Sequence, residues 1–173
     1  MILMSFKSWS YLPVNNWWMR PFSFINKKQE VDIKEQYNRF KVRGFDLTVR
    51  FNNKNQLLLC NNKIDYKYDS EQLLNDLSWI DSRTDCYIRV TLEDNKNKDR
   101  FIEFCKMLES NFKYIKFFGG CDYYNEHIYY FEHFPNYIES NFTTKSSSKS
   151  HNSILKSTFK DKDILILSFV NYV

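Results

Sequence analysis

The sequence contains no alanine, only three glycines and three prolines, and no long hydrophobic run. No segment approaches the ~20 consecutive apolar residues that a membrane-spanning helix needs, so we expect no membrane span. The first four letters, MILM, are too short for a signal peptide and lack a cleavage pattern. We therefore expect a soluble protein that is not exported.

Clustered metal ligands and a strong net charge are also missing. The net charge is +4, with 25 basic and 21 acidic residues well mixed, which does not indicate nucleic-acid binding. Eighteen asparagines and eighteen lysines fit an AT-rich genome, so these two residue types are weak functional signals. The sequence has no CxxC pair, which would have indicated a zinc site. We expect buried free thiols at Cys60, Cys86, Cys105 and Cys121.

Aromatic and aliphatic residues are plentiful. Hydrophobic residues make up 43% of the chain and include 16 Phe and 12 Tyr, enough to form the core of one domain over residues 1–173. The tryptophan-rich stretch at residues 9–24 is interpreted either as core packing or as a lipid-facing rim.

The spacing of apolar residues predicts alternating helices and strands. At 45–51, apolar residues alternate with Asp46, Thr48 and Arg50, which is typical of a strand, and the polar letters at 52–55 predict a hairpin. We further expect helices at 30–40, 70–80, 98–112 and 153–159, strands at 56–60, 86–94, 114–120, 127–134 and 163–172, and a loop at 135–153.

The helix at 70–80 has the clearest signals. Ser70 is the expected N-cap, and Leu73, Leu74, Leu77 and Ile80 share one apolar face. Strand–helix alternation between residues 45 and 120 predicts a parallel sheet, whose strand ends usually carry the chemistry. The residues expected at those ends are Arg50, Asn61, Glu93, Gly119 and Ser168.

An ordered series of short motifs resembles one enzyme family. The strand GFDLTVRF and its hairpin resemble the second strand of the phosphatidylinositol-specific phospholipase C-like phosphodiesterases. The letters SFKSWSYLP at 5–13 resemble that family's first-strand segment. WWMRPF, EQY, KFFGG and FVNY resemble a compact branch found in phages and gut bacteria. The resemblance implies a (β/α) TIM-type barrel. Because 173 residues are few for eight strands and eight helices, we expect a shortened or incomplete one.

The resemblance also implies a catalytic set that this chain lacks. Family members use two histidines as base and acid, an arginine that stabilises charge on phosphorus, and a carboxylate that orients the first histidine. Framework positions such as Trp9, Tyr11 and Asp46 still fit. The catalytic positions fall at Phe6, Thr48, Asn61 and Ser168, none of which can replace the expected group.

Several polar residues remain candidates for a pocket. Asp46, Arg50 and Glu93, with Trp9 and Tyr11, could line it. The carboxylates either form a structural ion-pair set or hold a divalent cation at Asp46 and Glu93. No other cofactor is implied. The three histidines, His127, His133 and His151, are interpreted as surface or strand-edge residues, although the first two are the candidates for a relocated base.

These expectations leave three hypotheses for function. The first is a catalytically degenerate phosphodiesterase, a pseudoenzyme that binds a phosphate-bearing ligand or a protein partner. The second is an active phosphoric diester hydrolase with a relocated or metal-based site. The third is a phage structural or host-interaction protein that reuses the fold. The resemblance implies a cytoplasmic location, in a bacterium or a phage-infected host cell.

Overall fold

The computed structural model describes most of the first 123 residues and three further strands. The described residues are 2–15, 18, 27–61, 64–84, 86–93, 96–123, 126–129, 137–140 and 164–167; side chains are described only between residues 3 and 118. Ser168, His133, His151 and the predicted helix at 153–159 lie outside the described residues.

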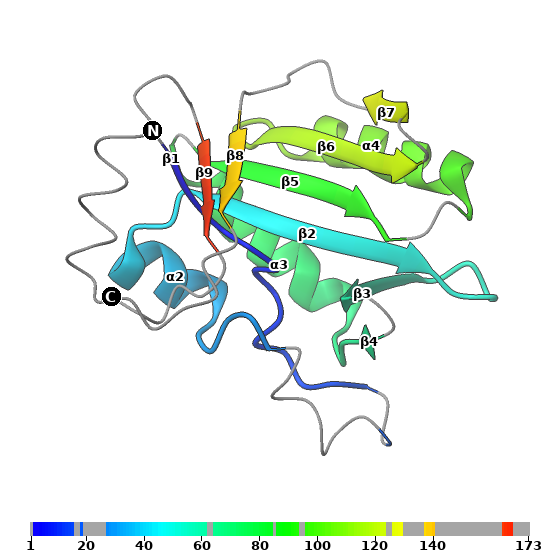
Figure 1. Cartoon of the computed structure of the whole chain (residues 1–173), viewed down its shortest axis with the longest axis horizontal. Helices are drawn as coiled ribbons and strands as arrows, with labels where there is room; N and C mark the ends of the chain where they lie inside the picture. Colours follow the sequence, from blue (N-terminus) through cyan, green and yellow to red (C-terminus); the bar gives the residue numbers. More distant parts are fainter. Residues whose placement is uncertain are drawn as a thin grey trace.

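The strands form one nine-stranded sheet (Figure 1). Its order along the main path is β7-β6-β5-β2-β1-β9-β8, and β3 and β4 extend it beside β2. All neighbours from β6 to β8 along this path are parallel, whereas β7 is antiparallel to β6 and β3 is antiparallel to β2. The strands are β1 (Ile2–Ser5), β2 (Gly44–Phe51), β3 (Leu57–Asn61), β4 (Ile64–Asp65), β5 (Tyr87–Leu92), β6 (Lys116–Tyr123), β7 (Glu126–Tyr129), β8 (Tyr137–Ser140) and β9 (Ile164–Leu167).

The sheet is open, so the expected TIM-type barrel is wrong, in its shortened form as well. Its two ends are β7 and β8, and no pairing between them closes the sheet among the described strands. At one end β7 turns back antiparallel to β6, which replaces the next parallel strand that a barrel would need. The described part has three helices, α2 (Ile33–Phe40), α3 (Ser70–Asp81) and α4 (Lys98–Asn111). The architecture is therefore a mixed α/β fold with an open sheet.

The main core lies between the sheet and its helices. In Figure 1, α3 and α4 lie behind the strands and α2 lies beside β1. Alternate residues of β2 and β5 are buried against the helices because side chains of a strand point to opposite faces in turn. This core includes Phe45, Leu47, Val49, Ile88, Val90, Leu77, Phe101 and Leu108.

Two features of α3 differ from the prediction. Its N-cap is Asp69, whose carboxylate accepts a hydrogen bond from the Gln72 amide, and Ser70 is the first helical residue. Leu74 is 44% exposed, so only Leu73, Leu77 and Ile80 form the buried stripe. In α2, Asp32 is the N-cap and accepts from the Glu35 amide at 2.8 Å. Both helices thus begin at an aspartate that satisfies a free backbone N–H.

The other helices and strands predicted up to residue 120 are confirmed within one to three residues. The strands predicted at 127–134 and 163–172 are confirmed at Glu126–Tyr129 and Ile164–Leu167, and residues 130–134 and 168–172 lie outside the described part. The hairpin after β2 is held by Asn52, whose amide donates to the Gln56 carbonyl at 3.0 Å. The expected loop at 135–153 is wrong in one part, because β8 occupies Tyr137–Ser140. No helix in the described part of the chain is long and apolar enough to cross a membrane.

Candidate functional site

Polar residues meet on the sheet face opposite the helices. Asp46 and Thr48 alternate with the core residues of β2, and Arg89 does so on β5. The parallel register pairs Asp46 with Arg89 and Thr48 with Thr91, so their side chains are cross-strand neighbours. Lys7, in the turn after β1, contacts both Asp46 and Thr48.

Asp46 is the buried centre of this cluster. Its side chain is only 1% exposed, and its Oδ1 accepts from Arg89 Nε at 2.9 Å. Its Oδ2 accepts from the Lys7 backbone N–H at 2.9 Å. Burial by itself raises the pKa of Asp46, but Arg89 and Lys7 together hold that pKa below the usual range of an aspartate. Asp46 is therefore an ionised, fully engaged acceptor at neutral pH.

Lys7 reaches across the cluster with its ammonium group. Lys7 Nζ donates to Thr48 Oγ1 at 3.1 Å and lies 3.4 Å from Glu93 Oε2. Its side chain is 13% exposed and its backbone is left-handed, with a φ of 49°. An ammonium has three donors, and these two contacts use two of them. The third donor of Lys7 can therefore serve a ligand.

A hydrogen-bonded serine network fixes the turn that carries Lys7. Ser8 Oγ accepts from the Asp46 amide at 2.7 Å and donates to the Ser5 carbonyl at 2.8 Å. Ser5 Oγ donates to Gln36 Oε1 at 2.7 Å, and Gln36 Nε2 donates to the Ser8 carbonyl at 2.9 Å. Because these residues are buried, breaking one bond leaves an unsatisfied polar group. The network ties the turn to both β2 and α2.

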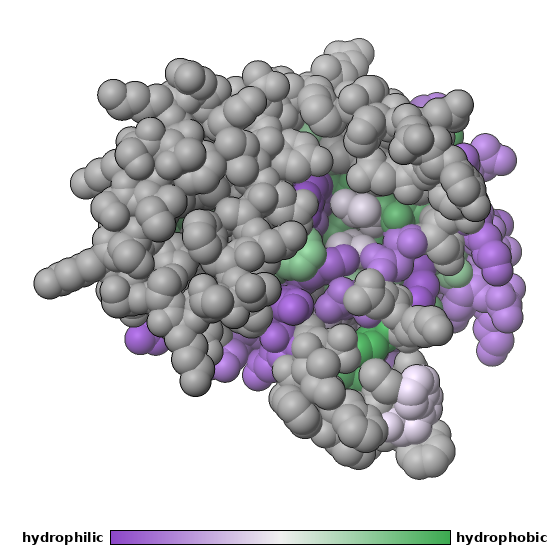
Figure 2. Space-filling model, in the orientation of Figure 1, coloured by the Kyte–Doolittle hydropathy of each residue, from purple (hydrophilic) through white to green (hydrophobic). Residues whose placement is uncertain are grey.

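A small cavity opens beside Lys7. Its enclosed volume is about 10 Å³. That is room for about one water molecule or one ligand oxygen, so a larger ligand could place only one polar group inside it. Figure 2 shows hydrophilic and hydrophobic described residues side by side on this face. The cavity is lined by Lys7, Trp9, Ser10, Asp46, Thr48, Leu59, Cys60 and Tyr66.

Two of the lining groups are kept protonated by burial. Burial raises the pKa of the Cys60 thiol to about 12 and raises the pKa of the Tyr66 phenol as well. Neither is a nucleophile at neutral pH. Cys60 Sγ donates to the Thr48 carbonyl, at 3.9 Å, whereas the Tyr66 hydroxyl can donate a hydrogen bond to a ligand. Ser10 Oγ accepts from the Lys28 and Gln29 amides at 2.9 and 2.8 Å, which leaves its own proton to donate.

The four positions where the resemblance places catalytic residues are not equally close to the cluster. Phe6 is half-buried, and its ring has Lys7 Nζ at 5.5 Å and Arg89 Cζ at 5.8 Å from its centroid. Thr48 lines the cavity and binds Lys7. Asn61 is buried at the end of β3, next to the lining residue Cys60. Ser168 lies outside the described residues.

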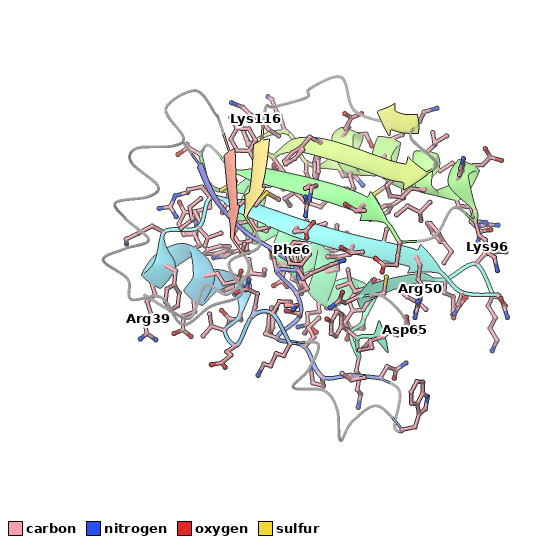
Figure 3. All side chains as sticks on the ribbon, in the orientation of Figure 1. Phe6, Arg39, Arg50, Asp65, Lys96 and Lys116 are labelled. Carbon is pink, nitrogen blue, oxygen red and sulfur yellow. The ribbon has the colours of Figure 1, made fainter. Side chains whose placement is uncertain are left out.

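The predicted pocket residues divide into two groups. Glu93 joins the cluster through Lys7, and Trp9 lines the cavity, with its Nε1 donating to Asp76 at 3.1 Å. Arg50 instead forms an ion pair with Asp65. Figure 3 shows Arg50 and Asp65 together near the far end of β2, away from Phe6. Tyr11 does not line the cavity; burial, with Asp76 nearby, raises the pKa of its phenol.

The sequence analysis did not identify Arg89 and Lys7. Arg89 alternates with Ile88 and Val90, the same signal that identified Asp46, and pairing the two strands in parallel brings the two charges together. Lys7 carries no comparable signal, since lysine is abundant and the turn is irregular. Only the fold brings it to Asp46.

The two carboxylates of the cluster face cations of the protein itself. Asp46 contacts Arg89 and Lys7, and Glu93 contacts Lys7. Among the residues whose placement is described, no three His, Cys, Asp or Glu come together as a metal site. His127 lies on β7 opposite Asp122 in the register, and its side chain is outside the described part.

No protein-family model matches this sequence, and no curated protein matches it either.

Proposed function

We propose that this chain is a binding protein rather than a hydrolase, and that Lys7 and its neighbours hold a small phosphate-bearing ligand. The observation that carries the proposal is the state of Asp46. Its two oxygens are engaged by Arg89 and the Lys7 amide, and its lowered pKa keeps it ionised. A carboxylate in that state holds the binding face together and does not exchange protons with a substrate.

The residues around Asp46 support a non-hydrolytic role. General acid–base catalysis needs a group whose pKa lies near the working pH. Phe6, Thr48 and Asn61 carry no such group, and burial raises the pKa of Cys60 to about 12. The cluster therefore offers hydrogen bonds and charge, and no histidine lies among the described side chains.

The donors that line the cavity favour an oxyanion. Lys7 provides an ammonium, and Thr48, Ser10 and Tyr66 provide hydroxyl groups around the same space. Charge-assisted hydrogen bonds from such donors are the usual means of holding phosphate oxygens. The cost is the negative charge of Asp46, which lines the cavity, and of Glu93 nearby. Arg89 offsets the first charge and Lys7 offsets the second. The enclosed volume of about 10 Å³ admits one phosphate oxygen, and the rest of the ligand would lie outside the cavity.

Titration calorimetry with inorganic phosphate and glycerol phosphate tests the proposal. We expect Lys7→Met to weaken binding about tenfold or more, because it removes a charge-assisted contact. The matched control is Lys54→Met, which removes the same charge from the exposed β2–β3 turn and should leave the Kd unchanged.

Two results would overturn this proposal. One is wild-type protein that binds neither probe at millimolar concentration. The other is equal loss of affinity in both lysine variants, which would indicate a general charge effect. Circular dichroism and urea unfolding of each variant would establish that the fold is intact.

A further inference from the structure

A second group of cations and aromatic rings lies where α2 and α3 end. Tyr37 and Trp79 pack edge to face, with ring centroids 5.3 Å apart. Arg43 Cζ lies 3.7 Å from the Tyr37 centroid, and Arg83 Cζ lies 4.2 Å from Trp79 and 5.8 Å from Tyr37. We call Tyr37, Arg43, Trp79 and Arg83 the arginine–aromatic cluster. All four side chains are half-buried.

The two arginines of this cluster have no acidic partner among the described residues. The ion pairs among the described residues join Lys7 to Glu93 and three arginines outside the cluster to one carboxylate each. Asp81 and Asp85 both lie two residues from Arg83 along the chain. Asp81 Oδ1 accepts from the Tyr114 and Ile115 amides instead, and Asp85 lies outside the described residues. The cluster thus carries two positive charges that the described part of the fold does not neutralise.

Hydrogen bonds to the protein itself account for the placement of Arg43 better than for that of Arg83. Arg43 Nη1 donates to the Tyr37 and Val42 carbonyls, which satisfies the C-terminal end of α2. Among the described residues, Arg83 Nη1 donates to the Ser82 hydroxyl alone, at 3.1 Å. The guanidinium lies over Trp79, so most of its N–H groups have no partner in the described part of the chain.

We propose that the arginine–aromatic cluster is a docking surface for an acidic segment of another protein. The planar guanidinium group matches a carboxylate with two parallel hydrogen bonds, and stacking on a ring fixes its direction in advance. The basic character extends along α2, where Arg39 is exposed and projects outward (Figure 3) and Lys41 follows it. Arg39 shares its charge with Glu35, so Arg43 and Arg83 form the centre of the surface.

The cluster favours an acidic peptide over a nucleic acid. Single-stranded nucleic acids bind by stacking bases on open aromatic faces. Here guanidinium groups already lie against Tyr37 and Trp79, and each ring meets the other edge to face. The groups that the cluster presents are N–H donors, and carboxylates are their complement.

Fluorescence anisotropy with three labelled probes tests this inference on the full chain. The probes are a twelve-residue peptide of alternating Glu and Ser, the same peptide with Gln for Glu, and a shorter thymidine oligonucleotide with the same number of negative charges as the Glu peptide. We expect the Glu peptide to bind more tightly than the Gln peptide, with affinity falling as salt is added. Arg83→Gln should weaken it about tenfold, since one charge-assisted pair is lost.

Controls separate this surface from the pocket at Lys7. Arg100→Gln removes the same charge from the exposed side of α4 and should leave peptide binding unchanged. Lys7→Met should also leave it unchanged, and Arg83→Gln should leave phosphate binding unchanged. Equal binding of the Glu and Gln peptides, equal loss in Arg83→Gln and Arg100→Gln, or tighter binding of the oligonucleotide than of the Glu peptide would each overturn the proposal.

Discussion

Asp46 and Arg89 form the most buried ion pair among the described residues, with side chains 1% and 10% exposed. Removing one partner of such a pair leaves the other charge without compensation in a poorly solvated site. The pair also connects β2 to β5 at the register position where the polar face is centred. The ion pair therefore contributes both to the stability of the fold and to the shape of the proposed binding site.

We predict that Asp46→Asn lowers the free energy of unfolding by about 3–5 kcal/mol, because Arg89 loses its counter-charge. Urea unfolding at pH 7 measures this. The matched control is Glu35→Gln, which breaks the exposed Arg39 pair and should cost at most about 0.5 kcal/mol. Similar losses in the two variants would contradict the structural role of Asp46.

The same pair predicts a dependence of stability on pH. The folded-state pKa of Asp46 lies below that of an unfolded aspartate, which is about 3.9. Its contribution to stability is therefore fully present above about pH 4 and is lost as the pH falls through the folded-state pKa. Unfolding at a series of pH values should show the difference between wild type and Asp46→Asn shrinking only below about pH 4. A difference that disappears near pH 6 would contradict it.

The helix α3 shows which features of an element a sequence pattern can predict: its position was predicted correctly, but its N-cap and its buried face were not. Its apolar spacing predicted a helix at the right place, because a 3.6-residue period is a local property. The N-cap was assigned one residue late, because Asp69 and Ser70 are adjacent and both residue types cap helices. Leu74 was assigned to the buried face and is 44% exposed, since the spacing does not give the width of the face.

The capping assignment gives a prediction at the level of the helix. Asp69→Ala should lower the free energy of unfolding by about 1 kcal/mol, because the Gln72 amide loses its acceptor. Ser70→Ala should change stability little, since Ser70 is already inside the helix. Urea unfolding of both variants compares them directly, and a larger loss for Ser70→Ala would contradict the structure.

For the whole molecule, the strands were easier to predict than the sheet they form. The parallel neighbours β2, β5 and β6 followed from strand–helix alternation. A barrel closes only if the two edge strands of the sheet pair with each other. The residue pattern within a single strand does not show which strands pair. The pairing of Asp46 with Arg89 could be inferred once β2 and β5 were neighbours. The place of Lys7 depends on a buried serine network that only the assembled fold provides.

The central claim is that the polar face binds and does not hydrolyse. The most direct measurement is the hydrolysis of bis(p-nitrophenyl) phosphate and of a glycerophosphodiester by purified wild-type protein between pH 5 and 9. We predict that product forms at the rate of buffer alone. Turnover well above that rate, lost in Glu93→Gln or Asp46→Asn variants that remain folded, would contradict the claim.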